Sequence, residues 1–513
     1  MSGHWSTVVL NHCKSVLRAD WCNDEVEDTK RWFAAAEQAL STLFSVSAAP
    51  EQDCAEIIKA LHQITLNDDQ KPICSPASLA RFCHVLGGCA LHLLIYTEAK
   101  AAELKKVKAS GAIQGTERAT HGEGEKDSLE SELGLAAEAE LDHDQRVANI
   151  IDNEIVSSNL LAVYEPILVR LVANENGKFS NMVLREASVL ALCKYMCISL
   201  SVCECHLPLL FTTLQAEKKA SVRGNIVVAL GDLAFRFPNA VEPWTSHIYK
   251  RLRDESSYVR SQTLMVLTHL ILNDMIKVKG QVSEIVLSLE DEEPQTADLA
   301  RLFFQELSKR GNNPIYNLMP DIVSRLSQDE NVSRKSFRSV MPFLMSFITR
   351  DKHSESLVEK LCFRFATCSN IQQTRDVAFC LAQLPINEKA LKKLDALIKT
   401  YKNALFDDEV HKSFQSLATK AKKFAKPEFR EMVQEFSDKL ASFNSGNGGE
   451  IKVNALGATK ENTEGAGPAS ELPKYIEEDK IEKTKGSNFS TKASESRDKE
   501  NTSTSTRRST RVR

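Results

Sequence analysis

Apolar residues recur at helical intervals in three similar stretches between residues 180 and 270. The stretches read LREASVLALCKYM, SVRGNIVVALGDLAFRF and YVRSQTLMVLTHLIL, and each has an arginine shortly before its apolar positions. These residues, Arg185, Arg223 and Arg260, lie 38 and 37 residues apart (223 − 185 and 260 − 223). A period near forty residues is typical of stacked helix pairs, in which each pair buries one apolar stripe against its neighbours.

The same spacing continues toward the C-terminus. Steps of about 37 to 41 residues lead to four further positions within apolar helical patterns. We call all seven positions the ladder: Arg185, Arg223, Arg260, Ala297, Arg334, Arg375 and Lys412. The pattern predicts an all-α fold, a HEAT-repeat or armadillo-type α-solenoid.

The ladder arginines admit two interpretations. They form a basic strip, or they pair with acids in the turns between helices, such as Asp254 and Glu255 or Asp329 and Glu330. We favour the structural interpretation, because their spacing repeats with the fold itself.

A first helix is predicted ahead of each second helix. Pro208, Pro243 and Pro320 are expected near the starts of three first helices, where a missing backbone N–H costs little. Short polar segments such as AEKKAS, RDESS and SQDEN separate the two helices of a pair. The predicted first helices cover residues 205–215, 242–252, 282–289, 317–326, 356–365 and 391–401.

The rest of the chain divides by composition into further regions. Residues 1–100 show helical patterns at 29–46, 54–67 and 78–99, which we interpret as degenerate HEAT repeats. Residues 101–148 are rich in charge, glycine and alanine and are expected to form a flexible insertion. The repeat module then covers 149–443, and the tail 444–513, rich in Ser, Thr, Lys and Glu with a basic end, is expected to be disordered.

Composition fits a helical intracellular protein. The chain is 42% hydrophobic, 26% charged and 7% aromatic, with a formal net charge of -4. That charge gives no global attraction to nucleic acid, so any contact with DNA requires a local basic patch. Most of the thirteen cysteines lie in apolar helical runs, which indicates a reducing compartment. The first residues lack a signal-peptide pattern, and the apolar run 85–96 is too short to cross a membrane, so no membrane partner is expected.

Two groups of cations are candidates for contact with DNA phosphates. The first group is expected to form a strip along one edge of the solenoid on both sides of the third stretch: Lys277, Lys279, Lys250, Arg251, Arg253, Lys309 and Arg310. The second group lies near the last repeat, and we favour its interpretation as the polar back of a capping repeat: Lys420, Lys422 and Lys423. Each group has the plain alternative of a solvated surface.

No catalytic motif is present, so we expect no enzyme, no cofactor and no small-molecule substrate. Phosphate-binding glycine loops, zinc-protease motifs and nucleophile elbows are all missing. One cluster invites a zinc hypothesis, but its second pair lacks the usual C-x₂₋₄-C spacing, and we favour ordinary core and turn residues. The cluster is Cys193, Cys197, Cys203, Cys205 and His206.

Several phrases of the sequence resemble the D2-type, or subunit 1, HEAT family of the condensin complex. They are NIVVALGDLAFRFPNAVEPWT, MVLTHLILNDMIKVKGQ, TADLARLFFQELSKRG, IYNLMPDIVSRLS and SESLVEKLCFRF. The resemblance covers roughly residues 132–443. It implies a non-catalytic subunit that contacts the kleisin, the SMC ATPase heterodimer, DNA and histones, in the nucleus and on chromosomes, with a cytoplasmic pool.

The chain departs from this family in two ways. Family members are much longer, and the tail has no Ser-Pro or Thr-Pro, since the chain's only such dipeptide is Ser75-Pro76. Two other HEAT classes are alternatives: a nuclear transport receptor of the importin kind and a phosphatase scaffold. Importin-type arrays are strongly acidic, which a net charge of -4 does not match.

Overall fold

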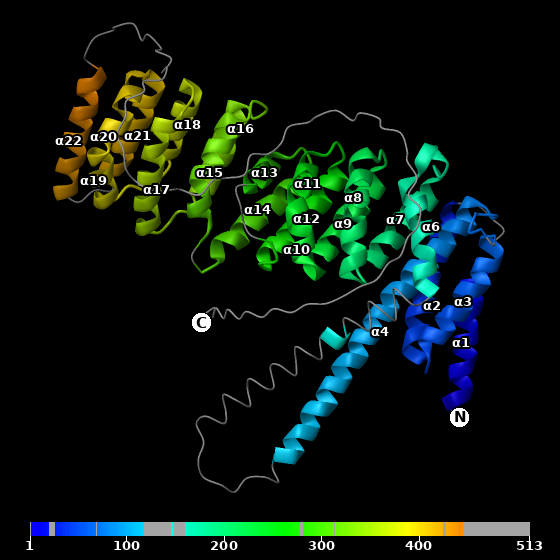
Figure 1. Cartoon of the computed structure of the whole chain (residues 1–513). Coiled ribbons are helices and arrows are strands. Elements are labelled where there is room, and N and C mark those ends of the chain that lie inside the picture. The colour runs from blue at the N-terminus through cyan, green and yellow to red at the C-terminus, as the bar shows by residue number, and fades with distance from the viewer. Residues whose placement is uncertain are drawn as a thin grey trace, which may run out of the picture. The chain divides into compact units, whose positions relative to one another are not determined.

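The described part of the chain is helical. A computed structural model describes residues 2–19, 26–67, 69–116, 145–147, 160–276, 281–311, 313–423 and 427–444. These residues lie in one compact unit, Met1–Asn447, and form helices joined by short turns (Figure 1). The all-α prediction is confirmed. The predicted tail beyond residue 444 and most of the predicted insertion lie outside the described residues.

Four helices precede the repeats: α1 (Ser2–Arg18), α2 (Val26–Val46), α3 (Pro50–Thr65) and α4 (Pro76–Thr116). The sequence pattern predicted the last three but not α1, and α4 extends well past residue 99. Buried Trp32 ties α2 to α1, because its Nε1 donates a hydrogen bond to the Val16 carbonyl at 3.3 Å.

Helix α4 packs closely on α2 and on the first repeat. A Cβ added at Gly87 would lie 2.8 Å from Ala191 Cα, and one at Gly88 would lie 2.5 Å from Leu40 Cδ1. Residues 76–107 of α4 are long and apolar enough to cross a membrane by composition alone. Because 67% of the most apolar window is buried, this helix has the character of a core helix.

Seven helix pairs follow in the described part of the chain. The second helices contain the ladder positions and are α7 (Met182–Met196), α9 (Ala220–Arg236), α12 (Ser257–Leu272), α14 (Pro294–Lys309), α16 (Arg334–Met345), α18 (Ile371–Leu381) and α21 (Asp408–Lys423). The unbroken first helices are α6 (Leu160–Ala173), α8 (Leu200–Ala216), α15 (Ile315–Gln328) and α17 (Asp351–Arg364).

The other first helices are broken into short α and 3₁₀ segments. The broken first helix before α14 comprises α13 (Val282–Leu287) and η5 (Ser288–Glu290). Helix α22 (Pro427–Asn444) packs on α21 after the last pair. The broken first helix before α12 comprises α10 (Pro238–Val241), η3 (Glu242–Trp244), α11 (Thr245–Tyr249) and η4 (Lys250–Arg253). The broken first helix before α21 comprises α19 (Glu388–Ala396), α20 (Ile398–Tyr401) and η7 (Lys402–Phe406).

One apolar stripe of each second helix forms the core. In α9 the apolar stripe of Val222, Ile226, Ala229, Leu230 and Leu233 is buried throughout. Helix α7 packs on α9, α9 on α12 and α12 on α14; farther along, α16 packs on α18 and α18 on α21. This nearest-neighbour stacking of helix pairs is the architecture of an α-solenoid.

The proline prediction was correct at one position and wrong at two. Pro243 lies in the first turn of η3, but Pro208 and Pro320 lie inside α8 and α15. An interior proline costs about 3 kcal/mol. Burial of Leu207 and Phe211 beside Pro208, at about 1.5–3 kcal/mol for each side chain, offsets that cost.

Candidate functional site

The ladder arginines of α7, α9 and α12 tie successive turns together. Arg223 donates from Nε and Nη2 to the Asp254 carboxylate at 2.9 and 2.6 Å, and from Nη1 to the carbonyls of Glu217 and Lys218. Arg260 binds the Asp291 carboxylate at 2.7 and 2.8 Å in the same manner. Each guanidinium therefore bridges the turn before its helix and the turn of the next pair.

The outer ladder positions follow this pattern unevenly. Arg185 donates to Glu217 at 3.1 Å, and Arg375 donates to Asp407 at 2.7 Å. Arg334 pairs instead with Glu409, two repeats farther along, and Lys412 is exposed. Ala297 has no charge to contribute.

Most cations of the first predicted DNA patch are paired with acids. Arg253 donates to Glu284 at 2.7 Å and to Asp329 at 2.6 Å. Arg251 lies 3.5 Å from Asp254, Lys309 lies 2.7 Å from Glu306, and Arg310 lies 2.5 Å from Asp274, while Lys250 is exposed. Lys277 and Lys279 lie outside the described residues.

The second predicted patch lies at the end of α21. Lys420 Nζ donates to the Ala382 carbonyl at 2.8 Å, and Lys422 Nζ donates to Gln434 Oε1 at 2.8 Å, so these lysines link α21 to α18 and to α22. Lys423 is exposed. All three lysines of this patch are exposed, and two of them also have contacts within the chain.

The cysteine cluster lies on two successive helices: Cys193 is buried in α7 and Cys197 caps its C-terminus, whereas Cys203, Cys205 and His206 lie within α8 and not in the predicted turn. Burial raises the pKa of Cys197 to about 11 and that of Cys203 to about 12, so both thiols are neutral near pH 7. His206 Nε2 lies 2.7 Å from Glu165 Oε1. Among the described residues, no group of three potential ligands is arranged to hold a metal ion.

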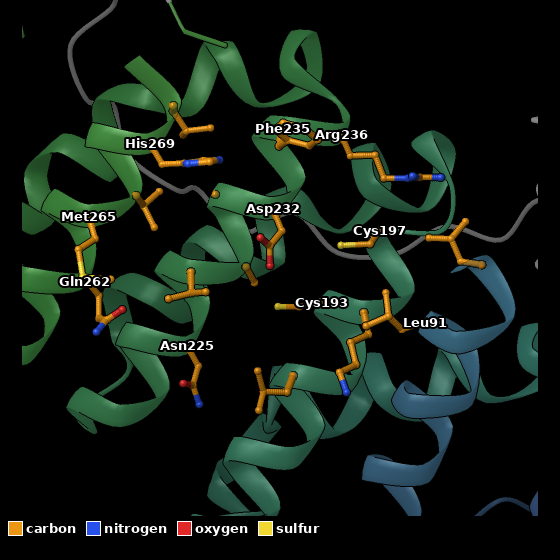
Figure 2. A pocket seen from close by; sticks show the side chains of 18 of the residues that line it. Leu91, Cys193, Cys197, Asn225, Asp232, Phe235, Arg236, Gln262, Met265 and His269 are labelled. Carbon is orange, nitrogen blue, oxygen red and sulfur yellow. The ribbon is translucent and has the colours of Figure 1, made fainter. Parts of the chain in front are cut away.

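A groove that the sequence did not reveal lies along α7, α9 and α12, with α4 at its end (Figure 2). Its volume is about 820 Å³, and its lining is mostly apolar. Figure 2 shows Cys193 and Asp232 directed into the space and Met265 and Gln262 on the opposite wall. A Cβ at Gly231 would lie 2.8 Å from Val266 Cγ1, so the floor depends on a close approach of α9 and α12.

Four apolar side chains are exposed in a regular series, and the first three of them line this groove. They lie five positions after successive ladder positions, and their exposed fractions are 36%, 40%, 48% and 50%. We call them the apolar row: Leu190, Val228, Met265 and Leu302, from α7, α9, α12 and α14. Ile95 of α4 and Phe235 of α9 add further exposed apolar surface at the α4 end.

Within the part of the chain that the structure describes, some charged side chains of the groove have a partner of opposite charge and one has none. Arg236 Nη1 lies 2.7 Å from Glu98 Oε1 and ties α9 to α4, and Lys194 Nζ lies 3.9 Å from Glu37. Asp232 has no lysine or arginine within 4 Å among the described residues. Partial burial raises the pKa of Asp232, with His269 acting weakly in the opposite direction.

One signal in the sequence points to this groove: the apolar row repeats with the ladder. Periodicity alone does not separate an exposed apolar position from a buried one, so the row was hidden among core residues. The contribution of α4 carries no local signal, because it comes from contacts nearly a hundred residues apart in the chain.

Known proteins are similar to this chain over most of its length. The family model of the non-SMC mitotic condensation complex subunit 1 matches residues 221–382. Condensin complex subunit 1 of Homo sapiens is 41% identical over 432 residues, which cover 80% of this chain and 30% of that protein. The Xenopus laevis protein of the same name is 40% identical over 421 residues, 80% of this chain and 31% of that protein.

A plant protein is similar to this chain over a comparable length. The Arabidopsis thaliana condensin-1 complex subunit CAP-D2 is 37% identical over 84% of this chain and 32% of that protein. This chain spans about a third of the length of these curated relatives. Over about four fifths of its residues, the chain is a homologue of condensin complex subunit 1.

Proposed function

We propose that this chain acts as a non-catalytic scaffold and regulatory subunit of a condensin-type complex and supports mitotic chromosome condensation. The observation that carries the proposal is about 40% identity to condensin complex subunit 1 over 80% of the chain. The helix pairs present an extended surface, which suits a scaffold.

The proposed partners are the kleisin subunit and the SMC ATPase heterodimer, with DNA and histones as chromatin partners. The proposed location is the nucleus and chromosomes, with a cytoplasmic pool. A partly exposed apolar row beside a groove supports protein binding, because aligned exposed apolar side chains mark interaction surfaces.

Co-purification tests this proposal against its two alternatives. The full chain is expressed with an affinity tag in dividing cells, and the bound proteins are identified by mass spectrometry. We expect SMC and kleisin proteins. Recovery of Ran would favour a transport receptor, and recovery of a phosphatase catalytic subunit would favour a phosphatase scaffold; either result without SMC proteins contradicts the proposal.

DNA contact is a second proposed activity, supported by Lys250 and Lys423 at the surface and by the sequence positions of Lys277 and Lys279. The test reverses two charges, Lys277→Glu with Lys279→Glu. If both lysines contact phosphates, affinity falls and the slope of log K against log salt becomes shallower by about two.

A matched control reverses two lysines of α19, Lys389→Glu with Lys392→Glu, and changes the net charge by the same amount. We expect the control to retain most of its affinity and its salt slope. Equal losses in the two variants would show that net charge alone matters, and unchanged binding in both would remove Lys277 and Lys279 from the interface.

A further inference from the structure

We propose that the apolar row and its groove form a docking site for an extended, lysine- or arginine-containing segment of a partner protein. Aliphatic side chains of the segment contact Leu190, Val228, Met265 and Leu302, and its cation pairs with Asp232. The inference rests on the proposed scaffold function and adds the location of a binding site and the chemistry of its ligand.

The apolar row is more than scattered surface hydrophobics. Single exposed apolar side chains are ordinary on any protein, but an aligned series on neighbouring elements is the sign of a binding surface. Here α7 packs on α9, α9 on α12 and α12 on α14, so the four side chains lie on successive packed helices. Phe235 and Ile95, 56% and 52% exposed, enlarge the surface at the α4 end.

Spacing favours an extended ligand. Packed helices lie about 8–10 Å apart, which sets the distance from one member of the apolar row to the next. A polyproline-type segment returns to the same face every three residues, about 9 Å along its axis. Aliphatic residues at every third position of such a segment therefore match the row, and about ten residues reach from Leu190 to Leu302.

Charge decides which segment fits. The groove's own cations already have acidic partners: Arg236 with Glu98 at 2.7 Å and Lys194 with Glu37 at 3.9 Å. Asp232 is directed into the groove, and no lysine or arginine of the described residues lies within ion-pair reach of it (Figure 2). A cation supplied by the ligand pairs with this exposed carboxylate, which has no lysine or arginine partner in the described part of the chain, so the site favours basic segments over acidic ones.

The same argument disfavours the acidic segment of this chain as the ligand. Residues 121–144 read HGEGEKDSLESELGLAAEAELDHD and have many more acids than lysines or arginines. An acidic segment brought beside Asp232 adds like-charge repulsion instead of a partner for the carboxylate.

A peptide selection tests the site without assuming the identity of the partner. A phage-displayed library of random 16-residue peptides is selected on the full-length chain. Clones are then measured as synthetic peptides against the wild type and two variants, Asp232→Lys and Met265→Glu. Both altered side chains are partly exposed, and circular dichroism melting verifies that each variant is folded.

We expect selected peptides with aliphatic residues at every third position and at least one lysine or arginine. Met265→Glu and Asp232→Lys should each weaken binding at least tenfold, and changing the peptide's cation to glutamate should restore binding to Asp232→Lys. Leu104→Glu, on the exposed part of α4 outside the groove, is the matched control and should bind as the wild type does.

Several results would overturn the proposal. If the selected peptides bind both groove variants as tightly as they bind the wild type, they bind outside the groove. Helical peptides with a seven-residue repeat, or acidic peptides, contradict the ligand chemistry. Peptides that bind only after residues 117–144 are deleted assign the groove to this chain, and a dimer abolished by Met265→Glu assigns it to a second copy. Failure to select any peptide also rejects the site.

Competition separates this inference from the proposed function. If a selected peptide displaces the kleisin from the purified complex, the docking site and the proposed scaffold function are both supported. If the kleisin and SMC proteins co-purify and no peptide depends on the groove, the scaffold function stands and the docking site fails. If groove peptides bind but no condensin subunit co-purifies, the docking site stands and the condensin assignment fails.

Discussion

The repeats from α7 to α14 differ from those from α16 to α21 in what they place five residues after the ladder position. In the first group the residue is aliphatic and exposed, as the apolar row shows. In the second group it is Ser339, which is exposed and polar, or Cys380 and Leu417, which are buried. One repeat length thus supports an open apolar face in one half and a closed or polar face in the other.

The ion pairs differ between the same two regions. In the first region an arginine reaches the next turn, as Arg223 reaches Asp254. Pairs that span two repeats occur from the third helix pair onward: Arg253 contacts Asp329, and both Arg334 and Arg338 contact Glu409. Arg375 reaches only the next turn, at Asp407. Ala297 carries no charge, and Asp329, in the turn that follows the next first helix, is paired by Arg253 instead.

The largest expected effect comes from Arg223→Met. The change leaves the Asp254 carboxylate, whose side chain is 4% exposed, without its cation, and breaking a buried pair costs about 3–5 kcal/mol. Arg375→Met should cost only about 1 kcal/mol, because the Arg375 side chain is 30% exposed. Urea unfolding of both variants measures the difference, and equal costs would contradict the distinction between the two regions.

The next effect separates the core from the apolar row. Leu230→Ala removes a fully buried side chain of α9 and should lower the free energy of unfolding by about 2–5 kcal/mol. Val228→Ala, two residues away and 40% exposed, should change it by less than about 1 kcal/mol. A large loss from Val228→Ala would show that the apolar row belongs to the core.

A smaller effect tests the joint between α4 and α7. Gly87→Ala places a methyl group 2.8 Å from a backbone atom of Ala191, and overpacking of this kind costs about 1–3 kcal/mol. Gly311→Ala is the control, because no atom lies within 4 Å of its added methyl group. Thermal unfolding followed by circular dichroism compares them, and a stable Gly87→Ala protein would indicate a looser joint.

The smallest effect is the response to acid. Hydrogen bonds from Arg253 and Arg375 lower the pKa of Asp329 and Asp407, respectively. Because the folded-state pKa is depressed, this stabilisation is full above the unfolded value of about 3.9 and is lost as pH falls through the lower folded value. Unfolding free energies at pH 6 and near pH 3 should differ less in Arg253→Met than in the wild type, by up to about 1 kcal/mol.

The sequence predicted the parts of this structure that depend on local periodicity. Helix pairs, ladder positions and the buried stripe of α9 all follow from apolar spacing, because burial on one helix face requires that spacing. Pro208 was misplaced because local rules ignore the burial around it. Arg253 resembled part of a basic strip because its partner Asp329 lies 76 residues away.

The groove was not predictable for a related reason. An exposed valine and a buried valine look alike in a repeat pattern, and only the packed neighbours decide which is covered. The wall contributed by α4 and the unpaired state of Asp232 depend on contacts between distant segments. Those contacts determine the shape and charge of the surface, and the periodic pattern determines only that a surface exists.

The arginine bridges also have a mechanical consequence. Each bridge joins two consecutive turns, so from α7 to α14 these charged links run along the edge where first and second helices connect. Charge-assisted bidentate hydrogen bonds are about twice as strong as neutral ones. We therefore expect this edge to hold consecutive repeats together more firmly than apolar packing alone would.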